Sequence, residues 1–272
     1  MPRVKNAIES DIAINTFALS NLSGILPISL TRNNLPANSK LLRDGLILGC
    51  LTFGIHLGLS FGVQTISANR TSFLFGLCVI FVALLDLLYR KRFSLKVLLA
   101  TILAFSGSAL MSWEQNSEPL IGTLWILGAV ACEATMLIIL EDISSNHDPL
   151  DLSLVRLGVA AILALGFGLN HFSDQLLIIQ SHWVPLFYLG AATAATTWLV
   201  IFALQTLPAV EASLIQGLEP IFGTVISFVV LGEVFGFRGV IGSMLILIGT
   251  AIAILAPLRK SMGINQLNHE DS

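Results

Sequence analysis

Charged residues are scarce in this chain of 272 residues, where Asp, Glu, Lys and Arg together make up only 11%. A soluble domain carries about 25% charged residues because its surface must face water. The composition therefore excludes an ordinary soluble domain. With 55% hydrophobic residues and a mean hydropathy of +0.85, it indicates a polytopic protein whose partner is the lipid bilayer. A formal net charge of −3 argues against a nucleic-acid partner.

Cysteine is also rare, and the three present all lie within apolar runs, which excludes a disulfide framework. No CxxC pair is present to predict a metal site. The sequence lacks the His-Glu-x-x-His and Asp-x-x-x-Asp patterns of metal-dependent membrane enzymes, and it lacks the Gly-x-x-x-x-Gly-Lys loop that binds ATP. We therefore expect no enzymatic activity, no metal, no cofactor and no ATP-driven step within this chain.

What the sequence does contain is a series of long apolar runs. A helix needs roughly 20 apolar residues to cross a bilayer, and eight segments have about that length. The runs are continuous rather than alternating, which favours helices over the strands of a β-barrel. We predict an all-α integral membrane protein with eight clear transmembrane helices, or nine if the more polar segment 12–30 spans. The eight segments are 42–66, 70–89, 94–113, 119–140, 150–170, 183–204, 210–231 and 236–256.

Basic residues orient these spans, because Lys and Arg are enriched in cytoplasmic links. The three basic clusters are Lys40 with Arg43, the run 90–96, and Arg259 with Lys260. With eight spans, all three clusters fall on the same side. We therefore predict a multi-pass protein of the plasma (inner) membrane with a cytoplasmic C-terminus. We also expect that segment 12–30 does not span fully and that the N-terminus is cytoplasmic.

The chain also aligns with itself. Residues 61–92 match 202–233 at nine positions, and the polar matches Gln64/Gln205, Thr65/Thr206 and Ser72/Ser213 raise the alignment above chance. The offset covers five helices, an odd number, so the two copies must have opposite orientations, as in many transporters. The first copy would begin ahead of Met1, so its first helix is missing. The predicted domains are a polar or degenerate segment (1–40), a truncated first repeat (41–113), a complete second repeat (119–256) and a cytoplasmic polar tail (257–272).

The run 212–233 resembles the ninth helix of EamA-type permeases in the drug/metabolite transporter (DMT) superfamily. In that family a Glu-Pro pair interrupts the helix and a Gly-Glu pair closes it, as Glu219-Pro220 and Gly232-Glu233 do here. Residues 65–74 resemble the start of the fourth helix. The resemblance covers roughly 42–256 and implies two five-helix inverted repeats that export or take up small metabolites. The first repeat departs from it, with Cys78-Val79 at the position of the Glu-Pro pair.

Three ionisable residues lie within predicted spans, although each costs roughly 2.5–3.5 kcal/mol in a bilayer on insertion scales. Glu133, Arg156 and Glu219 should lie at a similar depth in the cytoplasmic half, counted along their helices. A buried Arg between two carboxylates would satisfy all three charges. We predict a substrate or proton site here, with a structural ion pair as the alternative.

Four further residues are candidates for lining a solute path. Pro220 removes a backbone donor within a span, which predicts a helix break with carbonyls facing a cavity. Gln216 lies one turn before that break. His56 and Trp198 are polar or amphipathic groups inside other spans, although a histidine such as His56 is more often a packed residue that hydrogen-bonds a neighbouring helix.

A strip of small residues, Gly54, Gly58 and Gly62, repeats every four positions along one predicted helix. Such a strip lets two helices approach closely, either within one chain or across a homodimer.

Together these features favour a secondary transporter that moves a small metabolite or drug-like solute. Its transport would be driven by a proton gradient or by the gradient of the solute itself. The main alternative is a non-transporting remnant or membrane scaffold, because helix one is missing. A membrane-embedded enzyme is less favoured, since the sequence lacks the paired metal-binding motifs described above.

Overall fold

The computed structural model describes residues 38–90, 120–168, 183–216 and 236–255, together with Phe17 and scattered positions within 99–110 and 222–232. Every regular element in these parts is helical. The helices are α2 (Ser39–Gly62), α3 (Ala68–Gly76), α4 (Cys78–Arg90), α6 (Leu120–Ile143), α7 (Pro149–Gly168), α9 (Trp183–Leu204), α10 (Ala209–Gln216) and α12 (Phe237–Leu255), with a 3-10 turn at Ser144–Asn146.

Five helical stretches in the described part are long and apolar enough to cross a membrane, which agrees with a multi-pass, all-α membrane protein. They are Ser39–Gly62, Arg70–Tyr89, Leu120–Asn146, Pro149–Phe167 and Phe187–Leu204. Spans 94–113 and 210–231 are described only in part, so the number eight stays a prediction. Of segment 12–30, only Phe17 lies within the described residues.

Local signals explain where several helices begin. The Asn38 side chain accepts a hydrogen bond of 3.0 Å from the backbone N–H of Lys40, which caps α2. Helix α7 starts at Pro149, a residue suited to the first helical turn, and Asp148 accepts a hydrogen bond of 2.9 Å from the N–H of Leu150. Helix α2 ends at Gly62, earlier than predicted, because a turn over residues 63–66 leads to the next helix.

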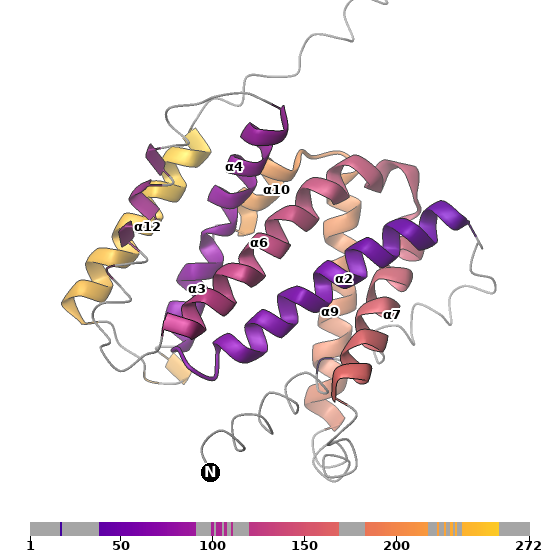
Figure 1. Cartoon of the computed structure of the whole chain (residues 1–272), viewed down its shortest axis with the longest axis horizontal. Coiled ribbons are helices and arrows are strands. Elements are labelled where there is room, and N and C mark those ends of the chain that lie inside the picture. The colour runs from indigo at the N-terminus through magenta and orange to yellow at the C-terminus, as the bar shows by residue number, and fades with distance from the viewer. Residues whose placement is uncertain are drawn as a thin grey trace, which may run out of the picture.

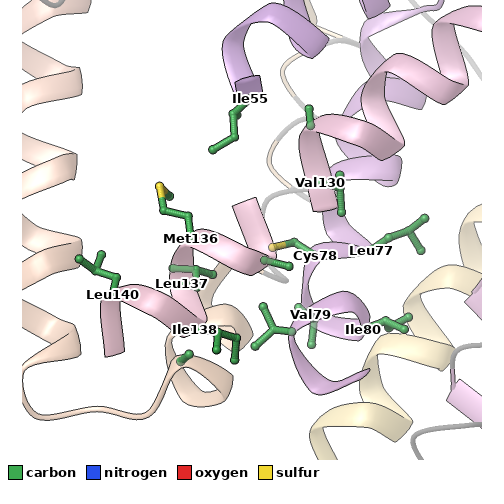
Figure 2. Close-up of a cluster of buried hydrophobic side chains, with 14 of the residues drawn as sticks. Ile55, Leu77, Cys78, Val79, Ile80, Val130, Met136, Leu137, Ile138 and Leu140 are labelled. Carbon is green, nitrogen blue, oxygen red and sulfur yellow. The ribbon is translucent and has the colours of Figure 1, made fainter. Parts of the chain in front are cut away.

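Helices α2 and α6 lie side by side across the middle of the bundle (Figure 1). Helix α7 packs on the other side of α2, and α9 packs beside α7. Helix α4 packs against α6, α10 and α12, with α12 at the outer edge in Figure 1. In the close-up of Figure 2, Cys78 and Val79 of α4 lie beside Leu137 and Ile138 of α6, and all four side chains are buried.

The predicted glycine strip is used within the chain. A Cβ atom added to Gly58 would lie 2.7 Å from the carbonyl oxygen of Trp125 and 2.9 Å from Cβ of Ala129, both on α6. A Cβ atom added to Gly62 would lie 2.3 Å from Cδ1 of Ile126. The strip therefore brings α2 against α6, and it provides no argument for a homodimer.

Replacing Gly58 with Ala should destabilise the protein by about 1–3 kcal/mol, because the added methyl group meets backbone as well as a side chain. Gly128→Ala is the matched control, since a Cβ atom there has nothing within 4 Å. That control should be neutral or stabilise by up to about 1 kcal/mol. Thermal unfolding of the two variants in detergent measures both effects. Equal midpoints for the two variants would contradict the close approach of α2 and α6.

One end of the bundle is joined by hydrogen bonds between helix ends. The Gln205 amide, just after α9, donates to the carbonyl oxygens of Ser144 and His147, at 3.1 Å each. The Ser144 hydroxyl donates back to the carbonyl of Leu204 at 2.9 Å. Nε2 of His147 lies 2.9 Å from Oδ2 of Asp44, near the start of α2. The start of α2 and the end of α9 therefore lie at the same end, so these two helices run in opposite directions.

The two segments that align in the sequence have the same local organisation. Helix α2, a short turn and α3 form one segment, and α9, a short turn and α10 form the other. In the first segment α3 and α4 are separated by the single turn residue Leu77, next to Cys78-Val79, and together they form one span. These features support the predicted inverted repeat, which stays a prediction for the full five-helix units.

Candidate functional site

Glu133 lies near the middle of α6 and accepts a hydrogen bond from a residue of α10. Gln216 is the last described residue of α10, and its Nε2 donates a hydrogen bond of 3.0 Å to Oε1 of Glu133. Both side chains are partly buried. A carboxylate in this setting needs such a donor, because burying a charged group without partners is strongly unfavourable.

The same amide also contacts α4. The Sγ atom of Cys78, the first residue of α4, lies 3.8 Å from Oε1 of Gln216 and acts as a weak donor. Residues of α4, α6 and α10 therefore meet at Gln216 and Glu133.

Arg156 lies beside this group, on α7. Its side chain is 7% exposed, and its Nε donates a hydrogen bond of 2.8 Å to Oγ1 of Thr52 on α2. The Thr52 hydroxyl in turn donates to the carbonyl of Leu48 at 2.8 Å. The buried Nη1 of Arg156 has no hydrogen-bond partner in the described part of the chain.

Glu133 and Arg156 are close enough for their charges to interact. No ion pair within 4.0 Å joins them among the residues that the structure describes; Glu133 accepts a hydrogen bond from Gln216, and Arg156 donates one to Thr52. The structure thus brings together Glu133, Arg156 and Gln216 of the predicted site. The arrangement of Arg156 between two carboxylates stays a prediction, because Glu219 lies outside the described residues.

His56 lies one helical turn beyond Thr52 on α2. Its Nδ1 is 2.8 Å from the carbonyl oxygen of Thr52, and its ring stacks on Phe17 with the ring centroids 3.4 Å apart. Phe17 is buried, with Ala160 and Ala164 of α7 in the same cluster. His56 therefore borders the site while one ring nitrogen and one ring face are already in contact.

The remaining predicted residues are not placed at this cluster. Trp198 lies on α9 with 36% of its surface exposed, and its ring stacks on Phe202 with the centroids 5.8 Å apart. Glu219 and Pro220 lie outside the described residues, so their place in the site stays a prediction.

Two residues of the cluster, Thr52 and Cys78, were missed by the sequence analysis. Thr52 lies four positions before His56, on the same helix face, but a single hydroxyl in an apolar run is not distinctive. Cys78 had a stronger signal, because the internal alignment pairs it with Glu219.

Two patterns typical of enzymes, a metal-binding cluster and a nucleophilic serine, can be compared with the described residues. They contain no group of three or more His, Cys, Asp or Glu side chains suited to hold a metal ion. Residues 58–62 match the Gly-x-Ser-x-Gly pattern of serine hydrolases, but Ser60 lies inside α2 and is buried. A hydrolase places this serine on a sharp turn between a strand and a helix, which α2 does not provide.

Comparison with known proteins adds the following. The model of the EamA-like transporter family matches residues 120–255. No curated protein matches the chain. Among solved structures 28 chains match, and one of them, described as "Crystal structure of protein", has a TM-score of 0.62 and 13% sequence identity. That match covers 92% of this chain and 89% of the other chain, and at this identity it supports the fold alone.

Proposed function

Since the chain belongs to the EamA-like transporter family, of the DMT type, we propose that it is a secondary transporter that moves a small organic solute across the membrane. The observation that carries the proposal is the polar contact of Gln216 with Glu133 and Cys78, close to the charge of Arg156, inside a bundle of apolar helices. Ionisable groups at such a place mark solute or proton paths in membrane proteins.

The groups suggest how transport is driven. Glu133 can take up a proton when the site opens to one side and release it when the site opens to the other. Its charge change alters the electrostatic interaction with Arg156, and a solute that binds there would be coupled to the proton gradient. Glu219, if it lies at the depth predicted from the sequence, adds a second proton acceptor. Export and uptake are both compatible with this arrangement.

The proposed location follows from the basic clusters of the sequence. We place the protein in the plasma (inner) membrane with a cytoplasmic C-terminus. The end of the bundle that contains Asp44, His147 and Gln205 is then the cytoplasmic end, because it includes the start of α2, which contains Lys40 and Arg43.

A comparison of metabolites inside and outside cells tests the proposal. Cells that produce the wild type, Glu219→Gln or an inactive membrane protein are compared at matched membrane levels. We expect the wild type to shift a few small compounds and Glu219→Gln to reduce that shift. If wild type and control cells have the same metabolites under several growth conditions, the chain is a non-transporting scaffold. If Glu219→Gln shifts the same compounds as the wild type, Glu219 does not belong to the path.

A further inference from the structure

We propose that Arg156 binds the carboxylate of a small organic anion, so that the solute of this protein is a monocarboxylate; this inference rests on the proposed transport function. The site lies between α7, which supplies the guanidinium group, and α2 and α6, which supply its polar surroundings. It is identified by a donor that the fold orients and leaves free.

The free donor is Nη1 of Arg156, which is buried and has no hydrogen-bond partner among the described residues. Buried polar atoms are nearly always paired in folded proteins, so an exception requires an explanation. A guanidinium group presents N–H donors in a planar fork that matches the two oxygens of a carboxylate. A bound carboxylate would therefore satisfy the atom that the protein itself leaves without a partner.

The guanidinium group is also held in one orientation. Its Nε is bonded to Thr52 Oγ1, and that hydroxyl is anchored to the carbonyl of Leu48, one turn earlier on α2. The side chain therefore does not have to reorient when the ligand arrives, which lowers the entropy cost of binding. The nearby carboxylate of Glu133 does not occupy this donor, because Nη1 has no partner among the described residues, and Oε1 of Glu133 accepts from Gln216.

The surrounding groups favour a single negative charge. Among the described residues, Thr52 bonds to Arg156, and the charges of His56 and Glu133 interact with it. Met136 contacts Thr52, and Gln216 lies beyond Glu133. Glu133 is the acidic group of this set, and its repulsion grows with each negative charge that the ligand carries. A monocarboxylate therefore fits better than a dicarboxylate or a phosphate dianion.

Ligand-induced stabilisation of the purified, full-length protein in detergent tests the inference. The probes are sodium butyrate, sodium succinate, inorganic phosphate and butylammonium chloride, each titrated at constant ionic strength while thermal unfolding is followed. Butyrate should raise the unfolding midpoint in a saturable way, and more strongly than the other probes. Ligands that bind only the folded state produce this shift.

Variants identify the group that binds. Arg156→Lys keeps the positive charge but loses the fork, and it should weaken the apparent affinity for butyrate about tenfold or more. Glu133→Gln should bind butyrate at least as tightly as the wild type, because a repelling charge is removed. Arg70→Lys is the matched control: Arg70 is another buried arginine, bonded to Thr123 at the α3–α6 contact, and its replacement should leave the butyrate affinity unchanged.

The outcomes separate this inference from the proposed function. An equal affinity for butyrate in the wild type and Arg156→Lys, or stabilisation by butylammonium alone, overturns the inference. If cells export or take up a neutral or cationic solute while butyrate fails to bind, the transport function stands and the carboxylate site is wrong. If butyrate binds through Arg156 but cells show no metabolite shift, the carboxylate site stands and the transport function is wrong.

Discussion

Replacing Glu133 with Gln should lower the rate of gradient-driven transport about 10- to 100-fold and leave the fold intact. Gln cannot take up or release a proton, so the proton step proposed for Glu133 is lost, and a 10- to 100-fold effect corresponds to about 1.4–2.8 kcal/mol. The new amide oxygen can still accept the hydrogen bond from Gln216, so the contact between α6 and α10 persists. Arg156 loses a nearby opposite charge but keeps its hydrogen bond to Thr52, which limits the cost to folding.

Vesicles with the purified protein and an imposed pH gradient measure this effect on the solute that the metabolite comparison identifies. Asp142→Asn is the control, because Asp142 lies on the same helix, is exposed, and should leave transport unchanged. Exchange of labelled for unlabelled solute without a pH gradient should be less affected than gradient-driven accumulation. If Glu133→Gln accumulates solute as fast as Asp142→Asn, Glu133 does not couple transport to protons.

Replacing Gln205 with Leu should destabilise the protein by about 2 kcal/mol, because two hydrogen bonds of about 1 kcal/mol each are lost. The carbonyl groups of Ser144 and His147 would lose a donor in a partly buried place. These two bonds link the end of α9 to the connection between α6 and α7. A neighbouring bond from the N–H of Ala209 to Oε2 of Glu141, at 3.0 Å, strengthens the same junction.

The internal alignment supplies the control for this variant, since Gln64 is the counterpart of Gln205. Gln64 lies in the turn after α2, and among the described residues its Nε2 donates only to the carbonyl of Ser60, one turn earlier, at 2.7 Å. Gln64→Leu should therefore change stability by less than about 0.5 kcal/mol, as for a surface substitution. Thermal unfolding in detergent compares the two variants. Similar losses for both would show that the bridging bonds at Gln205 add little.

Much of the fold could be predicted from the sequence. The continuous apolar runs predicted α2, α6, α7 and α9 close to the ends that the structure shows, because helix length in a membrane follows from bilayer thickness. The Glu219-Pro220 motif led to the family that residues 120–255 match. The single turn residue Leu77 between α3 and α4 was not predicted, because no proline marks it.

The site was predicted less completely. Counting residues along the helices placed Glu133 and Arg156 at one depth, and the structure brings them close together. The same counting could not show that Thr52 holds Arg156, or that Trp198 lies on the exposed face of α9. Depth depends on distance along a helix, whereas contacts depend on how each helix is rotated about its axis.

The sequence by itself determined the membrane environment, the family and the approximate positions of the helices, because these follow from composition, run length and local motifs. The tertiary structure alone decided that the glycine strip of α2 faces α6, that Cys78 meets Gln216, and that Nη1 of Arg156 is left free. Helices that are apolar on all sides contain no amphipathic stripe to indicate which face packs inward. Their rotation is set only when close packing and a few polar contacts select one arrangement.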